Sequence, residues 1–454
     1  MRRVLPFVVS LLFIVSVTAG TFAQTAVISA QESREDPELN RSRGIRMLKQ
    51  IKTAIKDRYY DRKYHGIDLN AKFDAAEERI RTLDKNWQIF RIIAGLVMEF
   101  NDSHTQFYPP GRANRVEYGF SIQMIGANCF ITDVKKDSDA AAKGLKPGDR
   151  VVGIGKFNPN RDNLWKINYL NYALDPQESI SVFILGPDGK EKEVRVAAKF
   201  KSIEQRQEEA KERRKKKRED PYKCHKVSPE LIACRLETFS VEKKYIDRMM
   251  AEAVSHPKMI LDLRGNGGGY VKTMEHLAGH FFDREVKIAE FVQRDKTRAS
   301  VAKPIKENAF KGELAILVDS NSGSASEVTA RLMQIEKRGK IYGDVTAGAV
   351  MTSIYVPMAE VRGAEGFQRF TTFGMNLTIG DLIMNDGNRL ENIGVIPDYP
   401  IGPTAYALAN GTDPVLAHVA KQMGATLTDQ QAGDFKFLKS KDEDEDDEET
   451  DEEN

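Results

Sequence analysis

Short apolar runs alternate with amphipathic segments between residues 222 and 403, and this alternation limits the fold more than any other feature of the chain. Five runs have the length and composition of buried strands: Ile232–Phe239, Met259–Leu263, Leu314–Val318, Ile341–Tyr342 and Thr372–Ile379. Three segments have helical spacing: Lys243–Ala253, Thr273–Phe281 and Ala325–Ile335. Elements in this order predict an α/β domain of layered helices and sheet over residues 222–405.

A corner of small residues, D-S-N-S-G-S-A-S-E-V-T-A-R (Asp319–Arg331), joins one strand run to one helical run. A serine at a helix N-terminus lies beside free N–H groups and the positive end of the helix dipole, which favour developing negative charge. We therefore interpret Ser324 as a candidate nucleophile. A serine that only caps the helix is the simpler alternative.

A glycine run, I-L-D-L-R-G-N-G-G-G-Y (Ile260–Tyr270), follows another strand run. Glycines permit positive φ and close approach to a ligand, and successive N–H groups can form an anion-binding nest. The run lacks the Lys-Ser/Thr pair of a P-loop and the spacing of a dinucleotide site. We therefore favour an oxyanion hole, with a purely structural turn as the alternative.

Five other segments complete the predicted organisation. Residues 45–110 have apolar positions at helical spacing and predict a small helical bundle. Residues 111–200 alternate short apolar runs with turn signals and predict a mostly-β module. Residues 24–44 are expected to be a linker, and residues 201–221 are expected to be either a charged helix or a linker. The C-terminal segment 406–454 ends in an acidic run that we expect to be disordered.

The first 23 residues have the features of a secretory signal. A basic start precedes the apolar core Val4–Val17, and the small residues Thr21 and Ala23 stand before a cleavage site. The core is short for a membrane span. We expect an exported protein, periplasmic or extracellular, that associates with a membrane only if this segment stays uncleaved.

The overall charge and the cysteines bear on the partners and the covalent structure that we expect. The net charge of +1 gives no reason to expect a nucleic-acid partner. Cys224 and Cys234 are equally far from a turn signal at Pro229, so a hairpin would place them opposite each other, within reach of a disulfide. Cys129 is expected to be a buried thiol.

His276 and His280 lie at i and i+4 in M-E-H-L-A-G-H, a spacing that can hold a metal ion on one helix face. No third ligand is evident in the sequence, so we favour packing on the helix face. We expect neither a metal nor another cofactor.

Four motifs together resemble the C-terminal processing (tail-specific) peptidases. Three are D-L-R-G-N-G-G-G, S-G-S-A-S-E and E-N-I-G-V-I-P-D; the fourth, K-G-L-K-P-G-D-R-V-V-G-I-G, is similar to bacterial PDZ domains. The resemblance covers residues 45–405 and implies a layered, ClpP/crotonase-like α/β protease core with a PDZ domain before it. A PDZ groove accepts an extended peptide as an added strand. Its carboxylate-binding loop would consist of Tyr118, Gly119, Phe120 and Ser121.

The chain departs from the commonest branch of this family. That branch takes a lysine base from an F-G-K-G motif, whereas this chain has T-A-G-A-V with Ala349 at the lysine's place. The chain is instead similar to the tricorn-core-like branch, which uses histidine and glutamate. N-D-S-H-T then supplies His104, with Ser103 as a neighbouring hydroxyl, and L-E-N-I-G-V-I-P-D supplies Glu391.

The resemblance implies a serine endopeptidase that works through an acyl-enzyme. His104 would take the proton of Ser324 and return it to the leaving amine. Glu391, directly or through Ser103, would orient the imidazole. The oxyanion would be bound by the N–H groups of Gly268, Gly269 and Ala325.

The leading hypothesis is an exported serine endopeptidase that cleaves unfolded or tail-exposed polypeptides, some of them held by their C-termini. The alternative is a catalytically inactive, PDZ-containing peptide-binding or scaffold protein, a hypothesis motivated by the missing lysine. A hydrolase of small esters is a third reading, because one fold can support several reactions. The sequence is also compatible with a homo-oligomer.

Overall fold

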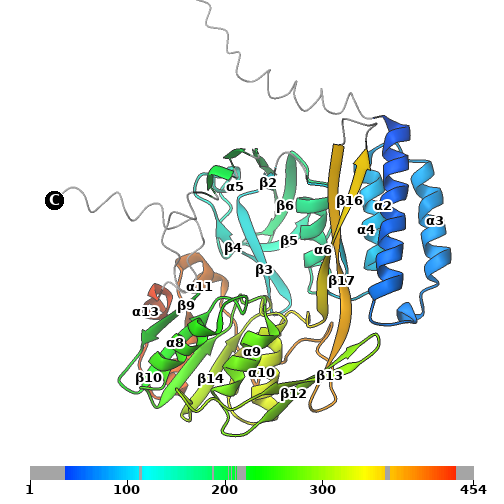
Figure 1. The fold of residues 1–454 in the computed structure, drawn as a ribbon. Helices are drawn as coiled ribbons and strands as arrows, with labels where there is room; N and C mark the ends of the chain where they lie inside the picture. Colours follow the sequence, from blue (N-terminus) through cyan, green and yellow to red (C-terminus); the bar gives the residue numbers. More distant parts are fainter. Residues whose placement is uncertain are drawn as a thin grey trace, which may run out of the picture.

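The computed structural model describes residues 36–111, 115–186, 189–202, 204–205, 207–209, 211, 221–362 and 369–435 (Figure 1). The expected signal segment 1–23 and the acidic run at the C-terminus lie outside the described residues. Among the helices that are described, none combines the length and the apolar character needed to cross a bilayer.

A six-stranded sheet forms the centre of the α/β domain, in the order β18-β15-β14-β11-β10-β9. Five strands run parallel: β10 (Leu231–Leu236), β11 (Lys258–Asp262), β14 (Glu313–Val318), β15 (Lys340–Gly343) and β18 (Tyr399–Pro400). β9 (Tyr222–Lys226) pairs antiparallel with β10 at one edge. Both faces of the sheet are buried, which explains why the central strands appear in the sequence as continuous apolar runs.

Helices cover both faces of this sheet. On one face lie α8 (Lys243–Ala253), α9 (Val271–Gly279) and α10 (Ala325–Ile335), packed on alternate strand residues such as Leu261 and Ile316. On the other face, α12 (Pro414–Gln422) packs on Ile260 and Leu317. These strands and helices confirm the predicted α/β alternation.

The α/β domain continues past residue 405, the end that we predicted for it. α11 (Ala405–Asn410), α12 and α13 (Asp429–Asp434) follow the last strand. The apolar residues Leu416, Val419 and Met423 belong to the same buried cluster as the sheet. The first part of the C-terminal segment 406–454 therefore packs on the same core as the sheet.

A second sheet connects the α/β domain to the N-terminal helices. It has the order β1-β17-β12-β13, with β16 paired to β17. The strands are β1 (Gln106–Tyr108), β12 (Val286–Gln293), β13 (Thr297–Ala302), β16 (Thr352–Arg362) and β17 (Arg369–Met384). β17 packs Phe373 and Met375 against the helices, and Leu382 and Met384 against the α/β core. Figure 1 shows β16 and β17 running beside the helices and down to the core.

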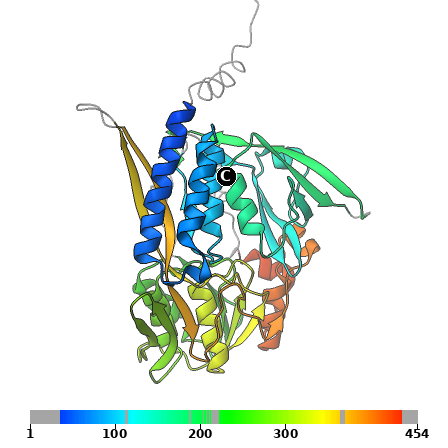
Figure 2. The same ribbon diagram turned by 90° about the vertical axis from the view of Figure 1, so that its right-hand side faces the viewer.

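Three helices form the predicted N-terminal bundle: α2 (Pro37–Arg58), α3 (Leu69–Arg81) and α4 (Asn86–Met98). α2 begins at Pro37 rather than at residue 45, because the Asp36 side chain caps it by accepting hydrogen bonds from the N–H groups of Glu38 and Leu39. Figure 2 shows the bundle standing above the α/β domain.

The module that lies between the N-terminal bundle and the α/β domain in the sequence is mostly β, as predicted. Its antiparallel sheet has the order β3-β4-β5-β6-β7. The strands are β3 (Phe120–Ile125), β4 (Asn128–Val134), β5 (Arg150–Ile154), β6 (Ser179–Leu185) and β7 (Glu191–Ala197). A pair of short strands, β2 (Arg115–Glu117) and β8 (Lys199–Lys201), and the helices α5 (Asp139–Ala142) and α6 (Leu164–Tyr169) complete it. Its assignment as a PDZ domain stays a prediction.

The cysteines behave as their surroundings indicated. Cys224 on β9 lies directly opposite Cys234 on β10, and a disulfide joins them. Cys129 is free and buried, and burial raises the pKa of its thiol to about 12.

Candidate active site

Ser324 stands at the turn between β14 and α10, immediately before the first residue of the helix. Its φ is +52°, a value that few residues other than glycine adopt. Its N–H donates to the Ala349 carbonyl and to Glu327 Oε2, both at 2.9 Å. Gly268 packs directly against it, since a Cβ at position 268 would lie 2.6 Å from the Ser324 Cβ. A strained backbone held on two sides presents this serine, as is common at functional sites.

Glu327 holds the loop that faces Ser324. Its carboxylate is fully buried and accepts four hydrogen bonds, from the N–H groups of Ser324, Gly348 and Ala349 and from the Thr346 hydroxyl. Burial raises the pKa of Glu327 to about 7, against the effect of these donors. Glu327 is the acidic residue of the S-A-S-E motif, and the motif alone did not predict this role.

The glycine loop offers a different set of donors from the one predicted. The Gly268 N–H donates to Asn266 Oδ1 at 2.9 Å, so it is already used within the loop. Within the described residues, the N–H groups of Gly269 and Ala325 donate no hydrogen bond. Of the three predicted oxyanion donors, only these two are therefore available without rearrangement.

Asn266 fixes the glycine loop and was also missed. Its side chain is fully buried and donates to the Leu236 carbonyl at 2.8 Å. Its own carbonyl accepts from the Gly323 N–H at 3.0 Å and from the Ser326 hydroxyl at 2.8 Å. One asparagine thus connects the glycine loop, β10 and the serine corner. An asparagine inside a glycine run was the only sequence signal for this role.

His104 lies on the loop between α4 and β1, where a chain of contacts leads back to Glu391. The Ser103 hydroxyl lies 2.6 Å from His104 Nδ1 and donates to Glu391 Oε2 at 3.0 Å. Glu391 also accepts the Ser103 N–H at 2.6 Å and the Val350 N–H at 3.0 Å. Burial lowers the pKa of His104, against the effect of nearby Asp102, and raises the pKa of Glu391.

Asp102 shapes this histidine loop. Its carboxylate is buried and accepts from the N–H groups of His104 and Thr105, the Tyr59 hydroxyl and the Thr378 hydroxyl. The loop is therefore tied both to α2 and to β17.

The serine and histidine parts of the site meet at Ala349 and Val350. Ala349 accepts from the Ser324 N–H, and Val350 donates to Glu391. In the described part of the chain no hydrogen bond joins Ser324 to His104. Among the described residues, the two side chains are linked only through the backbone of residues 349 and 350 and through Glu391 and Ser103.

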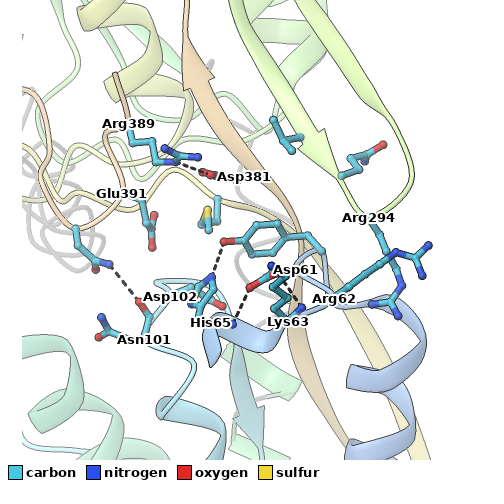
Figure 3. A pocket seen from close by; sticks show the side chains of 15 residues that line it. Asp61, Arg62, Lys63, His65, Asn101, Asp102, Arg294, Asp381, Arg389 and Glu391 are labelled. Carbon is cyan, nitrogen blue, oxygen red and sulfur yellow. Dashed lines mark hydrogen bonds and ion pairs between the residues drawn. The ribbon is translucent and has the colours of Figure 1, made fainter. Parts of the chain in front are cut away.

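A cavity of about 730 Å³ opens beside the histidine loop, and Glu391 lines part of it. Figure 3 shows Glu391 and Asn101 on one side of it and Arg62 and Arg294 on the other. Further lining residues include Lys63, Asp102, Asp381, Arg389 and Met351. The cavity is polar because acidic and basic side chains both line it, and it adjoins the candidate site because Glu391 is one of its lining residues.

The predicted carboxylate-binding loop lies at the start of β3. Tyr118 is buried and donates through its hydroxyl to the Gln177 carbonyl at 2.9 Å, and Gly119 has φ +74°. Phe120 and Ser121 begin β3, the end strand of its sheet.

The other end of β3 contacts the serine corner. Gln123 Nε2 donates to Asp319 Oδ2 at 2.9 Å, and the Ser320 hydroxyl donates to the Met124 carbonyl at 2.5 Å. The mostly-β module is thus joined directly to the loop that carries Ser324.

The chain is similar in sequence to known peptidases. Residues 233–401 match Peptidase family S41. The chain is 23% identical over 348 residues to the carboxy-terminal processing protease CtpB of Bacillus subtilis (strain 168). The aligned region covers 73% of this chain and 66% of CtpB. The chain is also 23% identical over 425 residues to a probable CtpA-like serine protease of Staphylococcus haemolyticus (strain JCSC1435), covering 88% and 73% of the two chains.

The fold is also similar to that of a solved structure. Mature CPAF complexed with lactacystin superposes with a TM-score of 0.61 at 14% identity, covering 82% of this chain and 96% of that one. At this level of identity the similarity concerns the fold.

Proposed function

We propose that this chain, which belongs to the C-terminal processing peptidases of the serine-type family S41, is an exported endopeptidase. Ser324 is the nucleophile, His104 is the base, and Glu391 is the group that orients the base. Its substrates are unfolded or tail-exposed polypeptides. Export rests on the signal-like residues 1–23 and accords with the Cys224–Cys234 disulfide.

The contact chain from Glu391 through Ser103 to His104 carries this proposal. An ionised Glu391 accepts a hydrogen bond from the Ser103 hydroxyl. The Ser103 oxygen can then accept a hydrogen bond from the N–H at His104 Nδ1. This assigns the proton to Nδ1 and leaves the lone pair on Nε2. A lowered pKa keeps that imidazole neutral at neutral pH, the state a general base needs.

The reaction then follows the acyl-enzyme route. With Ser324 Oγ and His104 Nε2 in hydrogen-bond reach, Nε2 removes the Ser324 proton while Oγ attacks the substrate carbonyl carbon. The N–H groups of Gly269 and Ala325 stabilise the oxyanion, each worth roughly 3–4 kcal/mol of barrier. The tetrahedral intermediate collapses as His104 returns the proton to the leaving amine. A water molecule repeats the sequence and releases the acyl group.

The mostly-β module is proposed to be a PDZ domain that captures substrate C-termini. β3 is an end strand, so an extended peptide has an edge to join, and Gly119 precedes it where a carboxylate would lie. Titration with a peptide that has a free C-terminal carboxylate, against the same peptide amidated, tests this assignment. Equal affinity for the two peptides would contradict it.

One observation favours the alternative of an inactive peptide-binding protein: no hydrogen bond joins the described Ser324 and His104 side chains. Turnover of an unfolded protein such as casein separates the two functions. The endopeptidase predicts cleavage by the wild type and by Ser42→Ala, a change in α2 outside the site, and none by Ser324→Ala. Absence of cleavage by all three, with peptide binding intact, would favour the inactive protein.

A further inference from the structure

Three side chains converge on the outer side of the α/β domain, between α8 and α9. His276 and His280 lie on the last turn and at the end of α9, and Asp247 faces them from α8. Asp247 Oδ1 is 2.7 Å from His276 Nε2 and 3.2 Å from His280 Nε2. Asp247 is thus the third ligand that the sequence could not identify, because it comes from a different helix.

The hydrogen bonds of His280 show why this is more than helix packing. Its side chain is 1% exposed, and Nδ1 faces the Asn308 carbonyl at 3.1 Å. A carbonyl only accepts, so Nδ1 carries the proton and neutral imidazole presents a bare lone pair at Nε2. That lone pair points at a carboxylate oxygen, which also only accepts. Two acceptors that face each other at 3.2 Å are satisfied by a proton or by a metal ion between them, and a metal ion would leave the imidazole neutral.

The arrangement has the features of a transition-metal site. The His280 Nδ1 contact with a backbone carbonyl is the outer interaction that commonly fixes a metal-binding histidine. The three ligand atoms all lie within 4.8 Å of one another. Tetrahedral zinc, with Zn–N bonds of about 2.0–2.1 Å, requires ligand atoms roughly 3.3 Å apart, which small rotations of these side chains would provide.

We propose that Asp247, His276 and His280 bind one Zn²⁺ ion that joins α8 to α9. Two imidazole nitrogens and one carboxylate oxygen suit zinc and disfavour Mg²⁺, which prefers oxygen ligands. The Asp247 side chain is 46% exposed, so a water molecule can complete the coordination. The negative end of the α9 dipole adds to the attraction for a cation.

The position suggests a structural effect on the peptidase site. α9 starts directly after the glycine loop, at Val271, and carries the two histidines at its other end. A metal ion there would hold α9 against α8 (Figure 1) and steady the helix behind Gly269. Zinc binding is independent of the chemistry at Ser324, so its test stands even if the proposed peptidase activity fails.

Calorimetric titration of the full chain, purified without a polyhistidine tag and stripped with a chelator, tests the proposal. We expect one Zn²⁺ per chain, a melting temperature raised by several degrees, and no response to Mg²⁺. Asp247→Asn and His276→Ala should each weaken zinc binding at least about tenfold. His418→Ala, which changes an exposed histidine on α12, should bind zinc like the wild type.

Co²⁺ provides a second measurement at the same site. A tetrahedral nitrogen-and-oxygen set should give a visible ligand-field band that disappears in Asp247→Asn, a near-isosteric change that keeps the helix surface. The proposal is overturned if the wild type shows no saturable zinc binding. It is equally overturned if the double variant Asp247→Asn/His276→Ala, folded by circular dichroism, binds Zn²⁺ with wild-type affinity.

Discussion

Ser103 is the residue through which the carboxylate of Glu391 reaches the imidazole of His104. Its hydroxyl contacts both groups, and its N–H is held by the same carboxylate. A hydroxyl can accept from Nδ1 and donate to Oε2 at once, which a methyl group cannot. In the proposed mechanism, the motif N-D-S-H-T therefore supplies both the base and the side chain that orients it.

Replacing Ser103 by alanine should lower kcat/KM by about 10²-fold, because the imidazole loses the partner that fixes its tautomer. Ser103→Thr keeps a hydroxyl and should recover most of the activity. Steady-state kinetics on an unfolded substrate, with melting temperatures as a check on folding, measures both. An unchanged rate in Ser103→Ala would show that Glu391 does not act through this hydroxyl.

Activity should fall in acid with an apparent pKa below about 6.5, the usual value for histidine. Burial lowers the pKa of His104, so the base stays unprotonated to a lower pH than a free imidazole would. The folded state then binds fewer protons than the unfolded chain near that pH, so this contribution to stability is complete above about pH 6.5 and is lost as pH falls. The pH dependence of kcat/KM reports the value; a midpoint above 7 would contradict the assignment.

At the scale of single elements, the corner between β14 and α10 depends on Glu327 more than on any feature predicted for it. Its four donors come from the corner itself and from residues 346–349. The loop that replaces the lysine motif of the commonest branch is thereby held against Ser324 by a carboxylate.

Glu327→Gln should reduce kcat/KM at least about tenfold and lower the free energy of unfolding by about 1–3 kcal/mol. One of the two oxygens becomes an NH₂ group, which faces donors where an acceptor is required. Thermal unfolding and kinetics on the same preparation test this. Exposed Glu242→Gln, at the start of α8, is the matched control and should leave both quantities unchanged.

The sequence was sufficient for elements with a strong local signal. α8 and α10 have the predicted bounds, and the central strands were readable because both of their faces are buried. The hairpin of β12 and β13 and the full length of β17 were missed, because their burial comes from partners far away in the chain. The short α12 was missed for the same reason.

The candidate site shows the same division. Ser324, His104 and Glu391 stand in short motifs, so they could be named from sequence. The hydrogen bond from the Gly268 N–H to Asn266 depends on the local conformation of the glycine loop. The lack of a hydrogen bond between the described side chains of Ser324 and His104 depends on how distant loops meet. Asp247 could not be joined to His276 because only packing brings α8 beside α9.

For the whole molecule, a buried ion cluster connects the glycine loop to the C-terminal helices. Arg264, directly before the loop, contacts Asp262 at 2.7 Å and Asp413 at 2.6 Å, with all three side chains at most 10% exposed. Asp413 also accepts from the Leu416 N–H and so caps α12. The helices beyond residue 405 are therefore joined to the segment that carries Gly269, a proposed oxyanion donor.

Asp413→Asn should lower the free energy of unfolding by roughly 3 kcal/mol or more, because it removes one charge from a buried cluster while keeping the cap. Urea unfolding measures the change. Asp429→Asn, an exposed aspartate at the start of α13, should remain within about 0.5 kcal/mol of the wild type. A small effect of Asp413→Asn would mean that the buried ion cluster contributes little to stability.

The central claim is that Ser324 is a nucleophile activated by His104, and labelling with a fluorophosphonate followed by peptide mapping tests it most directly. We expect one adduct per chain, on Ser324, formed about 10²-fold or more slowly in His104→Ala and absent in Ser324→Ala. An unlabelled wild type, or equal labelling of Ser324→Ala, would contradict it.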